Sequence, residues 1–184
     1  MRIAIFFATR EGQTRRIAER LASDLHERGI DTEIHDVRHL HQVPDWSRYA
    51  TAIVAASIHA GRHEREMIAF AKQHRTVLAD MKAAFVSVSL SERGVEDLTL
   101  PEDRRREHAA AVAEMIERFV DDTGWHPARV LPVAGALAYR QYNFFIRFVM
   151  KRIARANGAP IDTSRNHDLT DWDRVDRFAA EFVV

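Results

Sequence analysis

The sequence predicts a doubly wound α/β fold, with one five-stranded parallel sheet in a single domain that spans residues 1–184. Strand-like and helix-like segments alternate five times along the chain, an order that favours parallel strands joined by right-handed crossovers. Two strand segments, 2–8 and 50–57, are apolar almost throughout, as is typical of strands buried on both faces. The length of 184 residues suits one domain with one sizeable core.

The other elements follow from periodicity in the same way. Ile17, Leu21 and Leu25 recur at helical spacing on one face, and Ala109, Ala113 and Phe119 belong to a second apolar stripe. Helices are therefore expected over 13–29, 63–78, 105–122 and 169–184, further strands over 32–37, 82–90 and 128–137, and a solvated, charge-rich loop over 92–107. Pro132 predicts a bulge or an edge position for the last strand.

Composition excludes several classes of function. The chain has no cysteine, so disulfides, thiol nucleophiles and iron–sulfur ligation are excluded. The formal net charge is zero, and nothing global points to nucleic acid. None of the ten histidines has partners at a recognisable ligand spacing, so no metal site is expected. No apolar run reaches the ~18 residues needed to cross a bilayer, and the start has no signal-peptide layout. We expect a cytoplasmic protein.

The turn that joins the first strand to the first helix is the strongest candidate for a binding site. It reads TREGQT, residues 9–14. A helix N-terminus exposes unpaired N–H groups and a partial positive charge, which suit a phosphate. Gly12 would allow close approach, and Thr9 and Thr14 would add hydroxyl donors. The spacing is neither a Walker loop nor a three-glycine dinucleotide turn. It resembles the phosphate loop of flavodoxins, from which Glu11 departs; the alternative is an N-cap loop without a ligand.

The resemblance extends over nearly the whole chain and becomes more specific. It is carried by FATREGQTRRIA (7–18), IVAASIHAGRHE (53–64), AAFVSVSL (83–90), VAGALAYRQYNFF (133–145) and TDWDRVDRFA (170–179). These stretches are similar to the flavodoxin-like protoporphyrinogen IX oxidase family, the menaquinone-dependent dehydrogenases of bacterial haem synthesis. The resemblance implies strand order 2-1-3-4-5 and one non-covalent FMN. It also implies oxidation of protoporphyrinogen IX to protoporphyrin IX, with electrons passed to menaquinone or ubiquinone in the membrane.

Carried over residue by residue, the resemblance implies three FMN-binding loops. They are Thr9, Arg10, Glu11, Gly12, Gln13 and Thr14 for the phosphate, then Ser57, Ile58, His59, Ala60 and Gly61, then Val88, Ser89 and Leu90, with Arg93 at the edge of the third loop. Ala60 is small and the third loop has no aromatic residue. Either one flavin face stays open for a flat tetrapyrrole or quinone, or an aromatic side chain from elsewhere, Tyr139 or Tyr142, covers it.

Residues 138–165 form a basic, aromatic insertion before the last helix that is too long for an ordinary connection. On a helix, Arg147, Lys151 and Arg155 would share one stripe, with aromatic and aliphatic residues on the remaining surface. Such a helix could lie on an anionic membrane or bind the propionates of the substrate through its arginines. Tyr139, Arg140, Tyr142, Arg147 and Lys151, with Arg93, are the candidate contacts. A solvated basic helix docked by its aromatics is the plainer alternative, and RNA binding is a remote one.

These features favour a flavoenzyme that lies on the inner face of the cell membrane as a peripheral protein, with the flavin supplying the redox chemistry. Two rivals remain open. A flavodoxin-type electron carrier would usually be acidic, unlike this neutral chain with its cationic insertion. An FMN-dependent NAD(P)H:quinone reductase is the second rival, although the sequence shows no second nucleotide turn. His59 could accept a proton beside the flavin, but its loop position alone assigns it no catalytic role.

Overall fold

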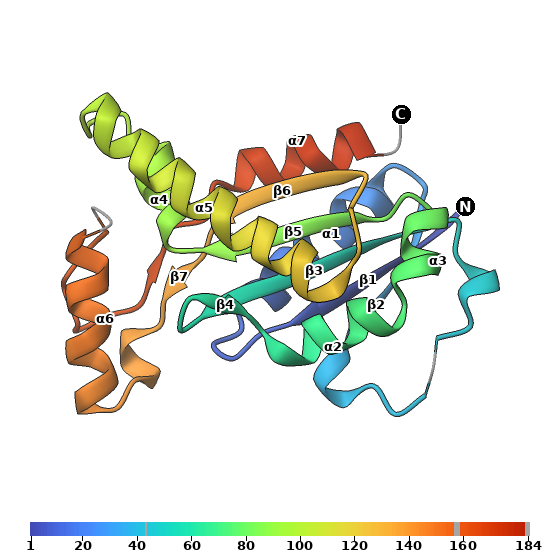
Figure 1. Ribbon diagram of the computed structural model, residues 1–184, viewed down its shortest axis with the longest axis horizontal. Helices are drawn as coiled ribbons and strands as arrows, with labels where there is room; N and C mark the ends of the chain where they lie inside the picture. Colours follow the sequence, from blue (N-terminus) through green and yellow to red (C-terminus); the bar gives the residue numbers. More distant parts are fainter. Residues whose placement is uncertain (43, 157–158, 183–184) are drawn as a thin grey trace.

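One sheet forms the centre of the computed structural model, which describes residues 1–42, 44–156 and 159–182 (Figure 1). Five parallel strands follow the order β2-β1-β3-β5-β6. In chain order these are the second, first, third, fourth and fifth parallel strands, so the predicted order 2-1-3-4-5 is confirmed. The strands are β1 (Arg2–Ala8), β2 (Asp31–Asp36), β3 (Thr51–His59), β5 (Ala84–Ser89) and β6 (Arg129–Ala134).

Three short strands lie outside this parallel order. β4 pairs antiparallel with the end of β3, and β7 and β8 form a separate two-stranded ribbon. The strand predicted over 128–137 is corrected to two strands, because the chain leaves the sheet at Gly135. Pro132 lies in β6, the last strand of the order, so its predicted edge position is confirmed. The short strands are β4 (Arg62–His63), β7 (Ala136–Leu137) and β8 (His167–Asp168).

Helices cover both faces of the sheet (Figure 1). α1 and α7 pack on one face, and α2, α3 and α5 pack on the other. The helix predicted over 63–78 is divided at His74 into α2 and α3. The helices are α1 (Gln13–Glu27), α2 (Arg65–Gln73), α3 (Arg75–Asp80), α4 (Ser91–Glu96), α5 (Glu102–Thr123), α6 (Phe144–Ala156) and α7 (Trp172–Phe182), with 3-10 turns η1 (Val37–His39), η2 (Trp46–Arg48) and η3 (Tyr139–Gln141).

The core confirms the periodicity read from the sequence. Side chains of β1 alternate between the two faces, so that Ile5 joins the core under α1 and α7 while Phe6 joins the core under α2 and α5. Ile17, Leu21 and Leu25 of α1 are completely buried. Each such side chain contributes about 1.5–3 kcal/mol by leaving water. The two cores hold the sheet, and with it the loops at the strand ends, in one position.

The start of α5 differs from the prediction. Ala109 and Ala113 are exposed, whereas Phe119 is buried. The helix has 22 residues and projects beyond the sheet at its N-terminal end, where it packs on α4 (Figure 1). Consequently the first half of its apolar stripe has no sheet beneath it. The charge-rich segment 92–107 is helical in most of its length, in α4 and the start of α5, and not the loop that was expected.

The insertion stands beyond the carboxyl ends of the parallel strands (Figure 1). It leaves the ribbon at β7, forms η3 and α6, and returns at β8; the predicted helix is confirmed for residues 144–156. Its own small core contains Leu137, Ala138, Tyr139, Tyr142, Ala154 and Ala159. The predicted ranges 138–165 and 169–184 include residues 157–158 and 183–184, which lie outside the described residues. In the described part of the chain, no helix combines the length and apolarity that a membrane span needs.

Candidate active site

The phosphate turn has the geometry that its glycine allows. Gly12 precedes the first residue of α1 with φ +93°, a left-handed conformation in which a side chain would be strained. Its N–H donates to Thr9 Oγ1 over 3.0 Å, which closes the turn. The peptide groups that follow are those at the start of α1, where the first N–H groups have no intrahelical acceptor. The turn therefore presents donors at the end of β1.

Thr14 supplies the observation that tests whether this turn suits an anion. The residue is completely buried, and its Oγ1 has no hydrogen-bond partner among the described residues. A buried hydroxyl without a partner costs free energy, about 1–3 kcal/mol. An acceptor placed at the helix N-terminus would satisfy it together with the backbone N–H groups. The donor set therefore fits a phosphate.

Gln13 links the phosphate turn to the closing strand of the insertion. Its Nε2 donates to Asp168 Oδ1 over 2.8 Å and to Thr170 Oγ1 over 2.7 Å. Arg16 donates to Gln13 Oε1 and pairs with Asp168 Oδ2, each over 2.9 Å. The Gln13 side chain is thus occupied within the protein, and its backbone N–H is what it can offer to a phosphate. Asp168 is a site residue that the sequence reasoning missed.

Glu64 is a second residue that the sequence reasoning missed. Its carboxylate side chain is 1% exposed and accepts from Arg10 Nε over 2.9 Å and from Ser57 Oγ over 3.3 Å. A carboxylate buried this deeply needs such partners, and the hydrogen bond raises the pKa of Arg10 in return. Arg10 and Ser57 belong to the first and second expected FMN loops. Glu64 therefore fixes these two loops relative to each other and pairs with the Arg10 guanidinium, which does not line the cavity described below.

The second loop is a two-residue hairpin between β3 and β4. Ala60 and Gly61 both have left-handed backbones, with φ +50° and +78°, as hairpins of this length require. For Ala60 this conformation costs of order 1 kcal/mol. The hairpin places His59 and Ala60 at the exposed rim, while Ser57 and Ile58 are half-buried.

The third loop is held by contacts of Ser89 and Glu92. It starts at the end of β5, where Ser89 Oγ accepts from the Glu92 N–H over 3.2 Å. The buried Glu92 carboxylate accepts from Arg174 of α7 over 2.5 Å. Burial, followed by the charge of Glu92, raises the pKa of the neighbouring Glu96 to about 7. Like the first two loops, the third loop is anchored by a buried carboxylate.

The three loops surround one cavity of 420 Å³. All residues expected to hold FMN line it except Arg10 and Gly12. The fourth wall is α6, which contributes Phe145, Ile146, Val149, Met150 and Ile153. One face of the insertion helix therefore closes the site that the sheet loops begin.

The residues expected to contact substrate or membrane do not gather in one place. Tyr142 lines the cavity, whereas Tyr139 is completely buried in the small core of the insertion and donates to the Pro160 carbonyl over 3.0 Å. Arg147 donates to the carbonyls of Tyr139 and Tyr142, over 3.2 and 3.1 Å, and so braces η3. Arg140 is exposed and Lys151 is half-buried. Of the two tyrosines proposed to cover a flavin face, Tyr142 is therefore the one in position.

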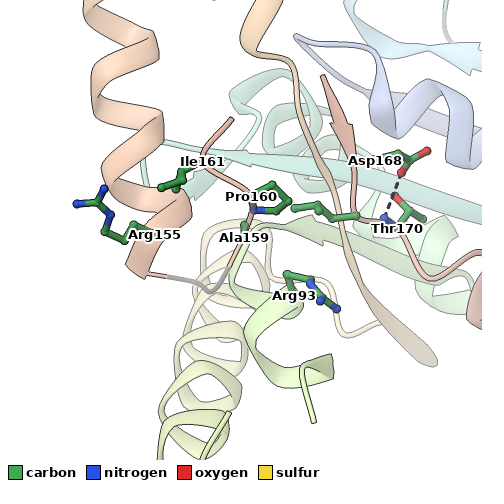
Figure 2. A pocket seen from close by; sticks show the side chains of 8 residues that line it. Arg93, Arg155, Ala159, Pro160, Ile161, Asp168 and Thr170 are labelled. Carbon is green, nitrogen blue, oxygen red and sulfur yellow. Dashed lines mark hydrogen bonds between the residues drawn. The ribbon is translucent and has the colours of Figure 1, made fainter. Parts of the chain in front are cut away.

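Arg93 lines a different and more open groove of 640 Å³. In the view of Figure 2, Arg93 of α4 and Arg155 of α6 lie on opposite sides of Pro160. Asp168 and Thr170, which hold the Gln13 side chain, form its far end. The groove therefore adjoins the phosphate turn through the two residues that bind the Gln13 side chain. No group of three or more histidine, aspartate and glutamate side chains suited to a metal ion occurs in the described ranges.

Comparison with known proteins first defines the class. Residues 4–164 match the family model of the flavodoxin domain. Two solved flavodoxins cover 100% of this chain and 97% of their own: oxidised flavodoxin 1 of Bacillus cereus, 16% identical with a TM-score of 0.50, and a short-chain flavodoxin associated with a bacterial microcompartment, 12% identical with a TM-score of 0.55. At these identities the two structures show a shared fold. The class is that of flavodoxin-domain proteins.

The curated relatives are more specific. Protoporphyrinogen IX dehydrogenase (quinone) of Escherichia coli strain K12 is 36% identical over 183 residues, which cover 100% of this chain and 95% of that protein. A protein of the same name from Leishmania major is 29% identical over 186 residues, 98% of this chain and 74% of that protein. The chain belongs to the family of these protoporphyrinogen IX dehydrogenases.

Proposed function

We propose that the protein is an FMN-dependent oxidoreductase of haem biosynthesis that oxidises protoporphyrinogen IX to protoporphyrin IX and passes the electrons to a quinone. The observation that carries the proposal is the single cavity shared by the phosphate turn, with its unpaired Thr14 hydroxyl, and the apolar face of α6. The names of the full-length relatives support the choice of substrate and acceptor.

In this proposal the bound FMN supplies a hydride acceptor that can afterwards release electrons to a quinone. The N-terminus of α1 and Thr14 would bind the phosphate. The hairpin at Ala60 and Gly61 and the loop at Ser89, which line the same cavity, would hold the isoalloxazine ring. Ligand cavities commonly hold about 300–1,000 Å³, so a cavity of 420 Å³ suits one flavin, and the porphyrinogen must approach along α6. The apolar side chains of α6 exclude water there.

We further propose that α6 rests on the inner face of the cytoplasmic membrane. Phe144, Phe145 and Phe148 are 87%, 72% and 56% exposed, an apolar patch that soluble surfaces seldom leave uncovered. Cationic side chains flank it at Arg140, Lys151, Arg152 and Arg155. A helix with this division lies in a membrane interface, with its cations on anionic headgroups. Such docking would bring the cavity next to the lipid that holds porphyrinogen and menaquinone or ubiquinone.

The direct test is anaerobic reduction of the bound flavin by protoporphyrinogen IX, followed by reoxidation with a menaquinone or ubiquinone analogue. We expect a yellow protein whose flavin is bleached by the porphyrinogen and restored by the quinone. Reduction by NADH and not by porphyrinogen would favour the reductase alternative, and reduction by neither would favour an electron carrier. Protein that stays colourless after incubation with FMN and dialysis would contradict the whole proposal.

The role of the insertion has a separate test. Replacing residues 138–166 by a two-residue turn keeps β7 and β8 paired, and with them the bonds from Gln13 to Asp168 and Thr170. We expect this variant to fold and bind FMN but to lose porphyrinogen oxidation and binding to anionic vesicles. Retention of both activities would show that α6 has neither proposed role.

A further inference from the structure

Two titratable side chains from different loops meet at the rim of the cavity, and neither is needed to hold a phosphate. Glu11 belongs to the phosphate turn and His59 to the β3–β4 hairpin, and both line the cavity. Glu11 Oε1 lies 3.9 Å from His59 Nδ1. Their side chains are 29% and 49% exposed, so the pair reaches both the cavity and bulk water.

The direction of Glu11 explains how a carboxylate is tolerated in a phosphate turn. Beside an anion a carboxylate is repelled, and its charge is better placed elsewhere. Here it faces His59 and lies near Tyr142, where burial, followed by the charge of Glu11, raises the pKa of the phenol to about 12. Glu11 therefore places negative charge on the cavity side of the turn, where a cation that develops during reaction would be stabilised.

Neighbouring charges are engaged with other groups. Arg10, adjacent to Glu11, pairs with Glu64. On the hairpin side Arg62 pairs with Asp122 of α5, and Arg118 of α5 donates to the Gly61 carbonyl over 3.3 Å and pairs with Glu114. Tyr142, from the insertion, accepts from the Ala138 N–H over 3.3 Å. Glu11 and His59 thus lie side by side, and the charged side chains next to them are paired with other groups.

We propose that His59, assisted by Glu11, is the base that removes the pyrrole protons during porphyrinogen oxidation. The inference rests on the proposed function. A methylene carbon between two pyrroles gives up its C–H electron pair and hydrogen as hydride, and FMN is the oxidant. The remaining cation is delocalised over both rings. One pyrrole N–H then breaks, its electron pair stays on nitrogen to neutralise the ring system, and its proton goes to the imidazole. Glu11 stabilises the imidazolium until the proton leaves to water.

The chemistry of the two side chains favours this division of roles. Imidazole titrates in the physiological pH range and is the side chain most often used as a general base. Its half-exposed position allows the proton to escape after each oxidation. The carboxylate opposite Nδ1 favours a proton on that nitrogen, which leaves Nε2 as the acceptor.

The test uses His59→Gln and Glu11→Gln in the FMN-loaded protein, with His26→Gln and Glu19→Gln on the exposed surface of α1 as matched controls. Anaerobic flavin reduction by protoporphyrinogen is followed by stopped flow from acid to alkaline pH. We expect His59→Gln to slow reduction by about 10²-fold and to remove the fall in rate toward acid pH. Glu11→Gln should lose less rate, and the controls none. Reduction by dithionite and reoxidation by quinone should match the wild type in the two controls.

Two further measurements do not depend on turnover of porphyrinogen. Glu11→Gln removes a negative charge from the cavity wall, so the midpoint potential of the bound FMN should shift to a more positive value, whereas Glu19→Gln should leave it unchanged. In His59→Ala, free imidazole should restore part of the lost reduction rate, because the emptied position opens to solvent. Absorbance of the bound flavin identifies any variant that has failed to fold or to bind FMN.

The outcomes distinguish a failure of the proposed function from a failure of the acid–base pair alone. Wild-type flavin that porphyrinogen does not reduce overturns the proposed function and this inference with it. Wild-type flavin that is reduced, together with variants that match its rate at every pH, overturns the acid–base pair alone. A slow His59→Ala that imidazole does not rescue overturns the assignment of the base to His59, and an unchanged potential in Glu11→Gln overturns the placement of its charge.

Discussion

The two halves of the cavity, the sheet loops and the insertion helix α6, are held in place by different kinds of contact. The sheet loops are anchored by buried polar contacts, such as the carboxylate of Glu64 between Arg10 and Ser57. The insertion helix α6 has one buried residue, Ala154, among its thirteen, and leaves three phenylalanines exposed. In the proposed function, the half held by buried polar contacts would bind the cofactor, while the exposed apolar surface of the other half would meet a second partner. This is the arrangement expected when function requires positional precision on one side and access on the other.

The largest difference between the halves should appear in the free energy of unfolding. Leu21 is completely buried in the core under α1, and Leu21→Ala should cost about 3–4 kcal/mol through lost burial and an unfilled cavity. Urea unfolding of the FMN-free protein measures the change. Phe148→Ala on α6 serves as the comparison, with an expected change below about 0.5 kcal/mol. Equal losses in the two variants would mean that α6 is part of the cooperative core.

Acid should weaken the sheet half through His63. This imidazole bonds to Ser87 Oγ over 2.9 Å between the rings of Phe85 and Phe119, and burial lowers its pKa to about 3. An unfolded histidine binds a proton near pH 6.5, so below that pH the unfolded chain holds more protons than the folded one. Stability should therefore fall as the pH drops below about 6.5, by about 2 kcal/mol at pH 5.

Urea unfolding between pH 7 and pH 5 measures this effect. The stability of His63→Gln should depend less steeply on pH than that of the wild type, by about one proton. His26→Gln, which removes an exposed histidine of α1, should leave the slope unchanged. If both variants retain the wild-type slope, His63 carries a proton in the folded protein and the assigned cause is wrong.

Thr14→Val should separate cofactor binding from folding. The substitution keeps the shape of the side chain but removes the unpaired buried hydroxyl. FMN affinity should fall about tenfold for the lost bond to the phosphate, while the FMN-free protein should be unchanged or more stable by up to about 1 kcal/mol. Flavin fluorescence titration and urea unfolding give the two values. Thr76→Val on the exposed surface of α3 is the control, and a matching loss of affinity there would remove the role of the Thr14 hydroxyl.

The fold was accessible to sequence reasoning because its signals are local. The spacing of Ile17, Leu21 and Leu25 is enough to predict the helix, and the position of Gly12 is enough to predict the turn. The contacts that organise the site are not local. Glu64 bonds to Arg10, 54 residues away in the sequence, and Asp168 bonds to Gln13, 155 residues away. No sequence pattern around a polar side chain indicates a partner so distant in the chain. These residues become visible only when the sheet brings its strand ends together.

The error at α5 has a different cause. Ala109 and Ala113 have the same helical spacing as Phe119. Periodicity predicts a helix, but it does not show whether the sheet lies under each part of that helix. The strands β5 and β6 have six residues each, about 20 Å, whereas the 22 residues of α5 span about 33 Å, so the helix extends beyond them. The same limit applies to α6, where Phe145, Ile146, Val149 and Ile153 line the cavity and are nevertheless exposed. Which of them a partner covers depends on surroundings that the chain does not encode.

The smallest change in stability should accompany the clearest change in location. Phe148 is 56% exposed on α6, and Phe148→Ser should alter the free energy of unfolding by less than about 0.5 kcal/mol. Binding to vesicles that contain anionic lipid should nevertheless weaken about tenfold, because a ring that enters the interface leaves water. Leu98→Ser is the matched control, since Leu98 is 82% exposed but lies outside the insertion. If both variants bind vesicles as the wild type does, the exposed rings of α6 serve a partner other than a membrane. A parallel loss in both would mean that apolar surface in general, and not the α6 helix, drives the association.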